Sequence, residues 1–156
     1  MLADPLFWFV AIGVALSMEP WSMVVHKLAW HGPLWWGHES HHVPTKGWLE
    51  LNDLFAAAHA PVAIFLIVYG FEAGDTRLHH MLIAIGYGMT AFGVSYFLVH
   101  DGFIHGRLPL AFLARFRYFR RVRNAHRAHH NRDDAPPFGL FLGPQELQWW
   151  RKRASR

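Results

Sequence analysis

Residues 81–99 read MLIAIGYGMTAFGVSYFLV and carry no formal charge. Two other stretches share this character: PLFWFVAIGVALSMEPWSMVV at 5–25 contains one charge, Glu19, and LFAAAHAPVAIFLIVYGF at 54–71 contains none. About 20 apolar helical residues are needed to cross the core of a bilayer. We therefore predict three transmembrane helices, at about 5–25, 54–71 and 81–99. The first stretch lacks a basic leader and a small-residue cleavage site, so we expect it to remain as a span.

The composition is that of a membrane protein. Of the 156 residues, 53% are hydrophobic and only 17% are charged, whereas soluble domains carry about a quarter charged residues. A soluble helical bundle is the alternative, but three such stretches would leave too little polar surface to cover them. The expected fold class is all-α: an integral membrane helical bundle of three or four spans, forming a single membrane-embedded domain over 1–156 with a histidine-rich di-metal site on the cytoplasmic side.

Basic residues are concentrated in the C-terminal tail. Residues 1–106 contain 3 Lys/Arg and 8 Asp/Glu, whereas residues 107–156 contain 12 Lys/Arg and 3 Asp/Glu. The positive-inside rule places this tail in the cytoplasm, together with the loop 26–53 that carries Lys27 and Lys46. The loop 72–80 is expected on the opposite side. LPLAFLARFRYF at 108–119 is interrupted by two arginines, which favours an interfacial helix over a fourth span.

Ten of the 13 histidines fall into four short motifs, in which an H-x4-H and H-x2-H-H pair occurs twice. These are His26 and His31; His38, His41 and His42; His100 and His105; His126, His129 and His130. Positions i, i+3 and i+4 of a helix share one face, so each H-x2-H-H directs three imidazoles the same way. By the predicted topology, all four motifs lie at the cytoplasmic face.

The H-x4-H spacing does not suit a regular α-helix, because residues i and i+5 lie about 140° apart around its axis. Either the helix ends within each motif or the two histidines bind different metals. Glycine and proline after His31 and glycines around His105 favour a helix end.

The chain has no cysteine, which excludes disulfides, thiolate metal sites and thiol nucleophiles. Ten imidazoles exceed the four ligands of a structural zinc site and favour two borderline transition metals with four or five nitrogens each. A solvent-exposed histidine-rich loop is the simpler alternative, but it does not explain the repeated spacing. His59, inside the second span, and His79 and His80, on the opposite side, are predicted not to be ligands.

The motifs resemble those of membrane-bound non-haem di-iron oxygenases (fatty acid hydroxylases, sterol oxidases and acyl desaturases) and, within that group, bacterial β-carotene hydroxylases. The resemblance covers residues 13 to 147. It is carried by HKLAWHG (26–32), HESHH (38–42), ELNDLF (50–55), HDGFIHGR (100–107), NAHRAHH (124–130) and PPFGLFLGPQEL (136–147).

The resemblance implies that the ten motif histidines bind two iron ions. It implies O2-dependent hydroxylation at carbon 3 of β-ionone rings, giving cryptoxanthin and then zeaxanthin, with reduced ferredoxin as electron donor, in a bacterial cytoplasmic membrane. Alternatives are a fatty acid or sterol hydroxylase or a desaturase with the same ligands, and a non-enzymatic membrane metal-binding or transport protein. Transport is disfavoured because only Glu19 and His59 are ionisable groups inside the predicted spans.

Several other polar residues are candidates for supporting the metal site. Glu19 lies inside a span and seven residues before His26, so we expect it to orient a motif histidine. Asp101 lies inside the third motif and has the same predicted role. Asn52 and Asp53 precede the second span, where helix capping and support of a histidine are equally plausible.

The arginine-rich segment 115–132 has two interpretations. It holds the tail on anionic lipid, or it attracts an acidic electron donor such as ferredoxin. Binding of nucleic acid is disfavoured, because the same segment contains the last histidine motif.

Overall fold

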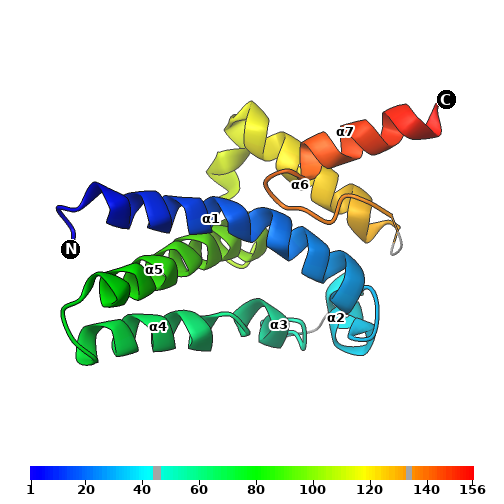
Figure 1. Cartoon of the computed structure of the whole chain (residues 1–156). Helices are drawn as coiled ribbons and strands as arrows, with labels where there is room; N and C mark the ends of the chain where they lie inside the picture. Colours follow the sequence, from blue (N-terminus) through cyan, green and yellow to red (C-terminus); the bar gives the residue numbers. More distant parts are fainter. Residues whose placement is uncertain (44–46, 133–134) are drawn as a thin grey trace. The chain divides into compact units, whose positions relative to one another are not determined.

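The computed structural model describes residues 1–43, 47–132 and 135–156. Within these ranges the chain is helical and contains no strand, which confirms the all-α prediction. Lys46 lies outside the described residues. In chain order the helices are α1 (Pro5–Val25), the π-helix η1 (His26–Trp30), α2 (Trp35–His42), α3 (Asp53–Ala57), α4 (Ala60–Glu72), α5 (Arg77–Phe97), the π-helix η2 (Leu98–Ile104), the 3-10 helix η3 (Ala111–Arg115), α6 (Arg117–His130) and α7 (Gly143–Ala154) (Figure 1).

Three helical stretches of the described chain are long and apolar enough to cross a membrane: Pro5–Trp30, Asp53–Glu72 and Arg77–Ile104. They contain the three predicted spans. Large apolar side chains point outward from them, as with Leu16 at 72% and Phe65 at 62% exposure. Such exposure suits contact with lipid, where an apolar surface carries no penalty. The prediction of a membrane helical bundle is confirmed.

The chain divides into two compact units, one of Met1–Met18 with Asp53–Ser95 and one of Glu19–Asn52 with Tyr96–Arg156. The single domain over 1–156 therefore stays a prediction. In the first unit, Phe7 and Ile83 are almost fully buried in one apolar cluster. Glycines allow close approach of the helices here: a Cβ at Gly86 would lie 2.6 Å from Ile67 Cγ1 and 2.8 Å from the Ala63 carbonyl oxygen.

In the second unit, the segment 108–119 does not form the one interfacial helix that was predicted. Residues Ala111–Arg115 form η3, Phe116 is extended with φ −88° and ψ 130°, and α6 begins at Arg117. The break at Phe116 lets Leu113 and Phe119 pack against one buried cluster of Val99, Phe103, Val122 and Leu140. The break thus brings Leu113 and Phe119, which a single helix would space along its axis, into contact with the same core.

We predict that Gly86→Ala destabilises the helical hairpin of α4 and α5 by about 1–3 kcal/mol, because the added methyl overpacks a closed contact. Gly93→Ala is the matched control on the same helix: nothing lies within 4 Å of a Cβ there, and alanine favours helix by about 1 kcal/mol over glycine. Unfolding by denaturing detergent from mild micelles measures both. Equal stability of the two variants would contradict this packing.

Candidate metal centre

Both H-x4-H motifs close through a π-helical turn. The amide of His31 donates to the carbonyl of His26 at 2.9 Å, and that of His105 donates to the carbonyl of His100 at 3.0 Å. These i→i+5 bonds widen the last turn of the helix, which brings residues five apart onto neighbouring positions. The helix ends at the second histidine in each case, as predicted. The π turn itself was not predicted, and it lets both histidines of a motif face one region.

A first group of five imidazoles gathers nitrogens that all lie within 4.8 Å of one another. Its members are His26, His31, His38, His42 and His129. The Nε2 atom of His26 lies 2.9 Å from that of His38 and 3.2 Å from that of His31. The Nε2 atoms of His31 and His129 are 3.1 Å apart. Donors from three separate segments of the chain therefore converge on one point.

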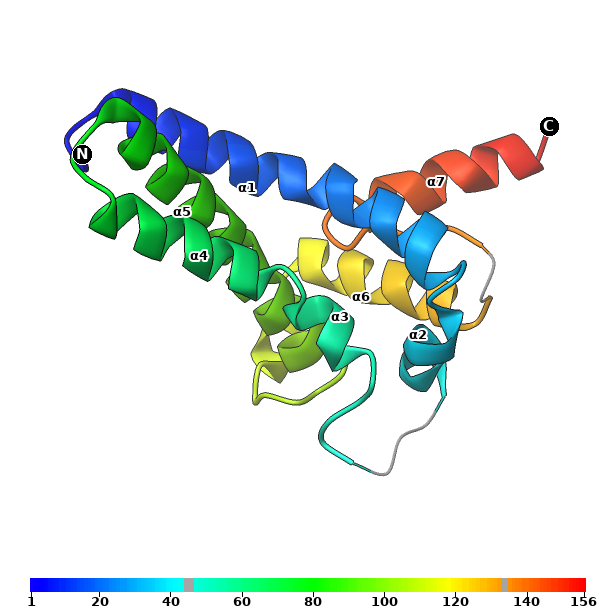
Figure 2. The same cartoon turned by 60° about the horizontal axis from the view of Figure 1, so that its bottom comes forward.

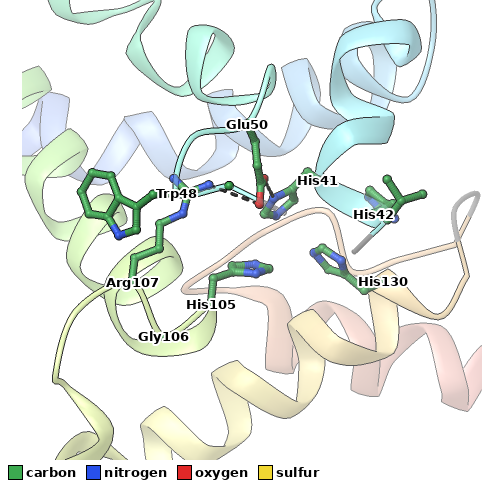
Figure 3. Close-up of a pocket in the computed structure, with 10 residues that line it drawn as sticks. His41, His42, Trp48, Glu50, His105, Gly106, Arg107 and His130 are labelled. Carbon is green, nitrogen blue, oxygen red and sulfur yellow. Dashed lines mark hydrogen bonds and ion pairs between the residues drawn. The ribbon is translucent and has the colours of Figure 1, made fainter. Parts of the chain in front are cut away.

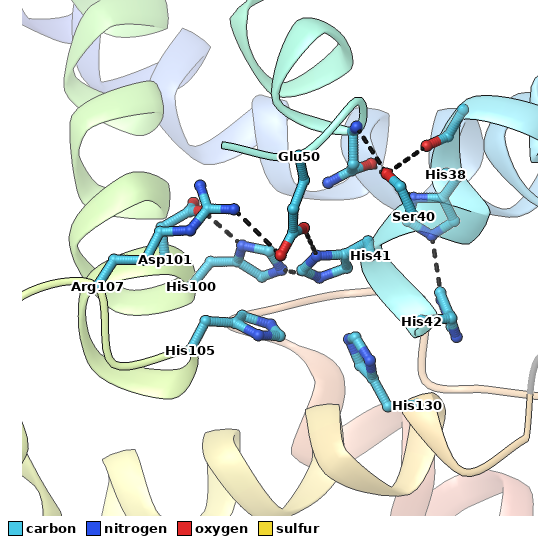
Figure 4. Close-up of polar contacts among 12 residues, drawn as sticks. His38, Ser40, His41, His42, Glu50, His100, Asp101, His105, Arg107 and His130 are labelled. Carbon is cyan, nitrogen blue, oxygen red and sulfur yellow. Dashed lines mark hydrogen bonds and ion pairs between the residues drawn. The ribbon is translucent and has the colours of Figure 1, made fainter. Parts of the chain in front are cut away.

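A second group of four imidazoles meets the same 4.8 Å criterion: His41, His105, His126 and His130. Nε2 of His126 lies 3.0 Å from Nε2 of His105 and 2.8 Å from Nε2 of His130. The tenth motif histidine, His100, adjoins this group, with its Nε2 3.0 Å from that of His41. Figure 4 shows His41, His100, His105 and His130 turned toward one another.

Each H-x2-H-H motif divides its histidines between the two groups. Helix α2 gives His38 and His42 to the first group and His41 to the second, whereas α6 gives His129 to the first and its other two to the second. The rings of His42 and His130 stack at 4.5 Å between centroids where α2 meets the end of α6 (Figure 2). Three imidazoles on one helix face thus serve two neighbouring sites.

Oxygen atoms fix the tautomers of five motif histidines. In the first group, the Nδ1–H of His26 donates to the Phe138 carbonyl at 2.8 Å, and the Nδ1–H of His38 donates to the side-chain oxygen of Asn52 at 2.7 Å. His129 donates likewise to the Ala135 carbonyl at 3.1 Å. In the second group, His41 donates to Glu50 at 2.8 Å and His100 to Asp101 at 3.1 Å.

These tautomers leave facing lone pairs. A neutral imidazole that is protonated on Nδ1 has only an acceptor at Nε2, so the Nε2 atoms of His26 and His38 cannot bond each other. The same holds for His41 and His100. A cation between them converts the repulsion into coordination, and bonds of about 2.1 Å to imidazole place adjacent donors about 3 Å apart. The donor set therefore fits two metal ions. The Nδ1–H groups donate to oxygen atoms, as the second ring nitrogen of a metal-bound histidine usually does.

Five imidazoles outside the spans are held neutral, the form that binds metal. Burial lowers the pKa of His38 to about 4 and that of His41 to about 2. Burial, with repulsion from neighbouring histidines, lowers the pKa of His42 and of His130 to about 2. For His126 the same causes lower the pKa well below its usual value.

The surroundings of the two groups differ. Aromatic rings enclose the first group: Trp30 lies 5.3 Å from His26, Trp35 lies 5.1 Å from His31, and Phe138 lies 5.5 Å from His129 between ring centroids. The second group borders a cavity of about 500 Å³ (Figure 3). That cavity is lined by His41, His42, Val43, Gly47, Trp48, Glu50, His105, Gly106, Arg107 and His130. Three histidines of the second group line it, as does one of the first group, His42.

The supporting residues predicted from sequence have mixed outcomes. Asp101 and Asn52 each accept from a motif histidine, as described. Glu19 was expected to orient a motif histidine, but its Oε1 accepts from the amide of Leu142 at 2.9 Å. Glu19 therefore positions the segment 135–142. Asp53 opens α3, where a carboxylate favours the helix N-terminus.

Sequence reasoning quoted the motifs ELNDLF (50–55) and PPFGLFLGPQEL (136–147) but did not predict that Glu50, or the segment 135–142, which we call the strap, would contact motif histidines. Glu50 lies two residues before Asn52, and this proximity was the sequence feature that could have indicated its role. The strap supplies the Phe138 and Ala135 carbonyls to the first group. Glu146 anchors it by accepting from the amides of Phe138 and Gly139 at 2.9 and 3.0 Å. No feature of the sequence indicates which backbone carbonyl will accept a hydrogen bond from a histidine.

The three remaining histidines lie outside both groups within the described chain. His80 contacts Asp75 at 2.6 Å, and His79 contacts the Thr76 hydroxyl at 3.1 Å. His59 precedes α4. Their assignment as non-ligands stays a prediction.

We predict that Asn52→Leu weakens metal binding at the first group by roughly 10- to 100-fold, because His38 loses the acceptor that fixes its tautomer. Asn52→Asp keeps an acceptor oxygen and is the matched control. Metal content of the purified proteins after dialysis against graded chelator measures the effect. Equal retention by both variants would contradict a role for the amide oxygen.

We predict that the metal-free protein loses stability as the pH falls below about 6.5. The histidine pKa values are lower in the folded chain than in the unfolded chain. Below the unfolded value the unfolded state binds more protons, so stability is present at higher pH and is lost toward pH 4. Unfolding of the chelator-treated protein across pH 4 to 8 tests this, and constant stability from pH 8 to 5 would refute it.

Comparison with known proteins finds related sequences over most of the chain. The family described as Fatty acid hydroxylase matches residues 11–145. Beta-carotene hydroxylase 1 of Capsicum annuum is 44% identical over 89% of this chain and 44% of its own length. Beta-carotene 3-hydroxylase of Gentiana lutea is 45% identical over 89% of this chain and 43% of its own length.

A bacterial relative matches over a larger share of both chains. Beta-carotene hydroxylase of Pseudescherichia vulneris is 42% identical over 95% of this chain and 82% of its own length. The chain spans less than half the length of the two plant relatives. No solved structure matches. The chain belongs to the fatty acid hydroxylase family.

Proposed function

We propose that the protein is a β-carotene 3-hydroxylase, a non-haem di-iron monooxygenase of carotenoid biosynthesis. The observation that carries the proposal is the gathering of ten imidazoles in two adjoining groups, in a chain whose relatives are named as β-carotene hydroxylases. An unactivated ring methylene offers no handle to acids, bases or nucleophiles, so a redox cofactor must supply the oxidising power.

Each histidine group would hold one iron ion: His26, His31, His38, His42 and His129 the first; His41, His100, His105, His126 and His130 the second. Bound iron would supply reductive activation of O2. The overall reaction inserts one oxygen atom into a ring C–H bond. The other oxygen leaves as water, with two electrons from the donor and two protons from solvent, and cryptoxanthin and then zeaxanthin are formed.

The protein's own side chains would position the reacting groups and control access of water. Aromatic side chains that contact the first group would limit the access of water to it. The cavity beside the second group has the size of sites that take small ligands. Oxygen acceptors on Nδ1 keep the imidazole planes fixed.

The electron donor would be an acidic redox protein such as reduced ferredoxin. Arginines of α6, including Arg117, Arg121 and Arg127, are exposed, and so are the basic residues of α7 from Arg151 to Arg153. Such a surface speeds the association of an acidic partner. The same charges favour anionic lipid and support the cytoplasmic placement of the histidine motifs and of the tail 107–156 in a bacterial inner membrane.

We predict that expression in bacteria that accumulate β-carotene yields cryptoxanthin and zeaxanthin, measured by pigment chromatography. His129→Ala should abolish both products, because it removes a buried nitrogen from the first group. His79→Ala should keep activity within about twofold, since it lies outside both groups.

Two outcomes would count against the proposal. Full activity of His129→Ala would contradict the two-metal assignment. A well-expressed, iron-loaded protein that leaves β-carotene unchanged but hydroxylates fatty acid or sterol would shift the substrate to the lipids suggested by the family's name.

A further inference from the structure

Arg107 links the two carboxylates that support the second histidine group. Its Nη2 lies 3.2 Å from Glu50 Oε1, and its Nη1 lies 3.0 Å from Asp101 Oδ1. The other oxygen of each carboxylate accepts from a histidine, Oε2 of Glu50 from His41 and Oδ2 of Asp101 from His100. One guanidinium thus joins two ligand–carboxylate pairs that lie far apart in the sequence (Figure 4).

The linkage is largely shielded from solvent. The side chains of Arg107, Glu50 and Asp101 are 11%, 10% and 7% exposed. A planar guanidinium bonded to two carboxylates fixes the orientation of both planes, whereas a flexible ammonium contacts them only as a point charge. At this burial the ion pairs are screened less than pairs on the surface.

The Nδ1 contacts described for three histidines of the first group are of another kind. His26 and His129 donate to backbone carbonyls and His38 donates to an amide oxygen, all of them neutral acceptors. A carboxylate partner makes a metal-bound imidazole a stronger donor than a neutral oxygen does. Nδ1 partners are described above for five of the ten motif histidines, and among these five His41 and His100 are therefore the more electron-rich.

We propose that Arg107 is a positioning residue that acts through Glu50 and Asp101 on His41 and His100, so that its loss weakens metal binding at the second histidine group and leaves the first unchanged. The proposal rests on the proposed metal binding by the two groups. It goes beyond the reaction, because it names the residue that holds two histidines of one metal site in place.

The sign of the effect separates positioning from simple electrostatics. Removal of a positive charge near a cation site would by itself tighten metal binding. Loss of orientation at Glu50 and Asp101 would weaken it, because His41 and His100 would no longer be held toward the ion. The proposal predicts weakening.

The test is a titration of the metal-free full-length protein in detergent with Co²⁺, followed by visible absorption and metal analysis. The wild type should bind two equivalents. Arg107→Met should weaken one equivalent by roughly 10- to 100-fold and leave the other unchanged. Arg107→Lys should fall between Arg107→Met and the wild type, and Asn52→Leu should weaken the equivalent that Arg107→Met leaves unchanged.

Arg77→Met, at an exposed position at the start of α5, is the matched control and should bind as the wild type does. Tighter binding by Arg107→Met, or equal weakening of both equivalents at unchanged helix content, would overturn the proposal. If Arg107→Met fails to fold, wild-type affinities in Arg107→Lys would overturn it equally. Carotenoid hydroxylation does not enter this titration, so a wrong substrate assignment would leave its result intact.

Discussion

The structure depends on one electrostatic constraint, the placement of imidazole lone pairs that face one another at about hydrogen-bonding distance. Nε2 of His26 and of His38 are 2.9 Å apart, and those of His41 and His100 are 3.0 Å apart, while each Nδ1 already donates to an oxygen. Neutral nitrogens at such separations repel unless a cation lies between them. The surrounding elements, from the π turns to the strap over residues 135–142, hold these nitrogens in place against that repulsion.

The two candidate sites are interdependent because α2 and α6 contribute to both. A shift of α2 would move His38 and His41 together, so it would disturb both groups at once. The supports nevertheless differ: aromatic rings and backbone carbonyls serve the first group, whereas carboxylates, an arginine and an adjoining cavity serve the second. Under the proposed function, two ions held in this way would share a scaffold but not the same set of supporting groups.

Sequence alone predicted the helical class and the three apolar spans, and it singled out ten histidines whose role as metal ligands stays a prediction, because hydrophobic runs and repeated spacings are local patterns. Asp101 could be named since it adjoins His100. The division of each H-x2-H-H motif between two groups could not be predicted, because it depends on where α2 meets α6. The π turns after Val25 and Phe97 have no signature in the residues themselves. Glu19 was expected to contact a histidine, but the direction of its carboxylate toward Leu142 depends on a strap more than a hundred residues away.

The account is tested most directly by iron quantitation combined with X-ray absorption spectroscopy of the purified, iron-loaded protein. It predicts two iron ions per chain, each with the scattering pattern of four or five imidazole rings and iron–nitrogen distances of about 2.1 Å. A single iron per chain, or ions surrounded mainly by ligands other than imidazole, would contradict the claim that these histidines form two metal sites.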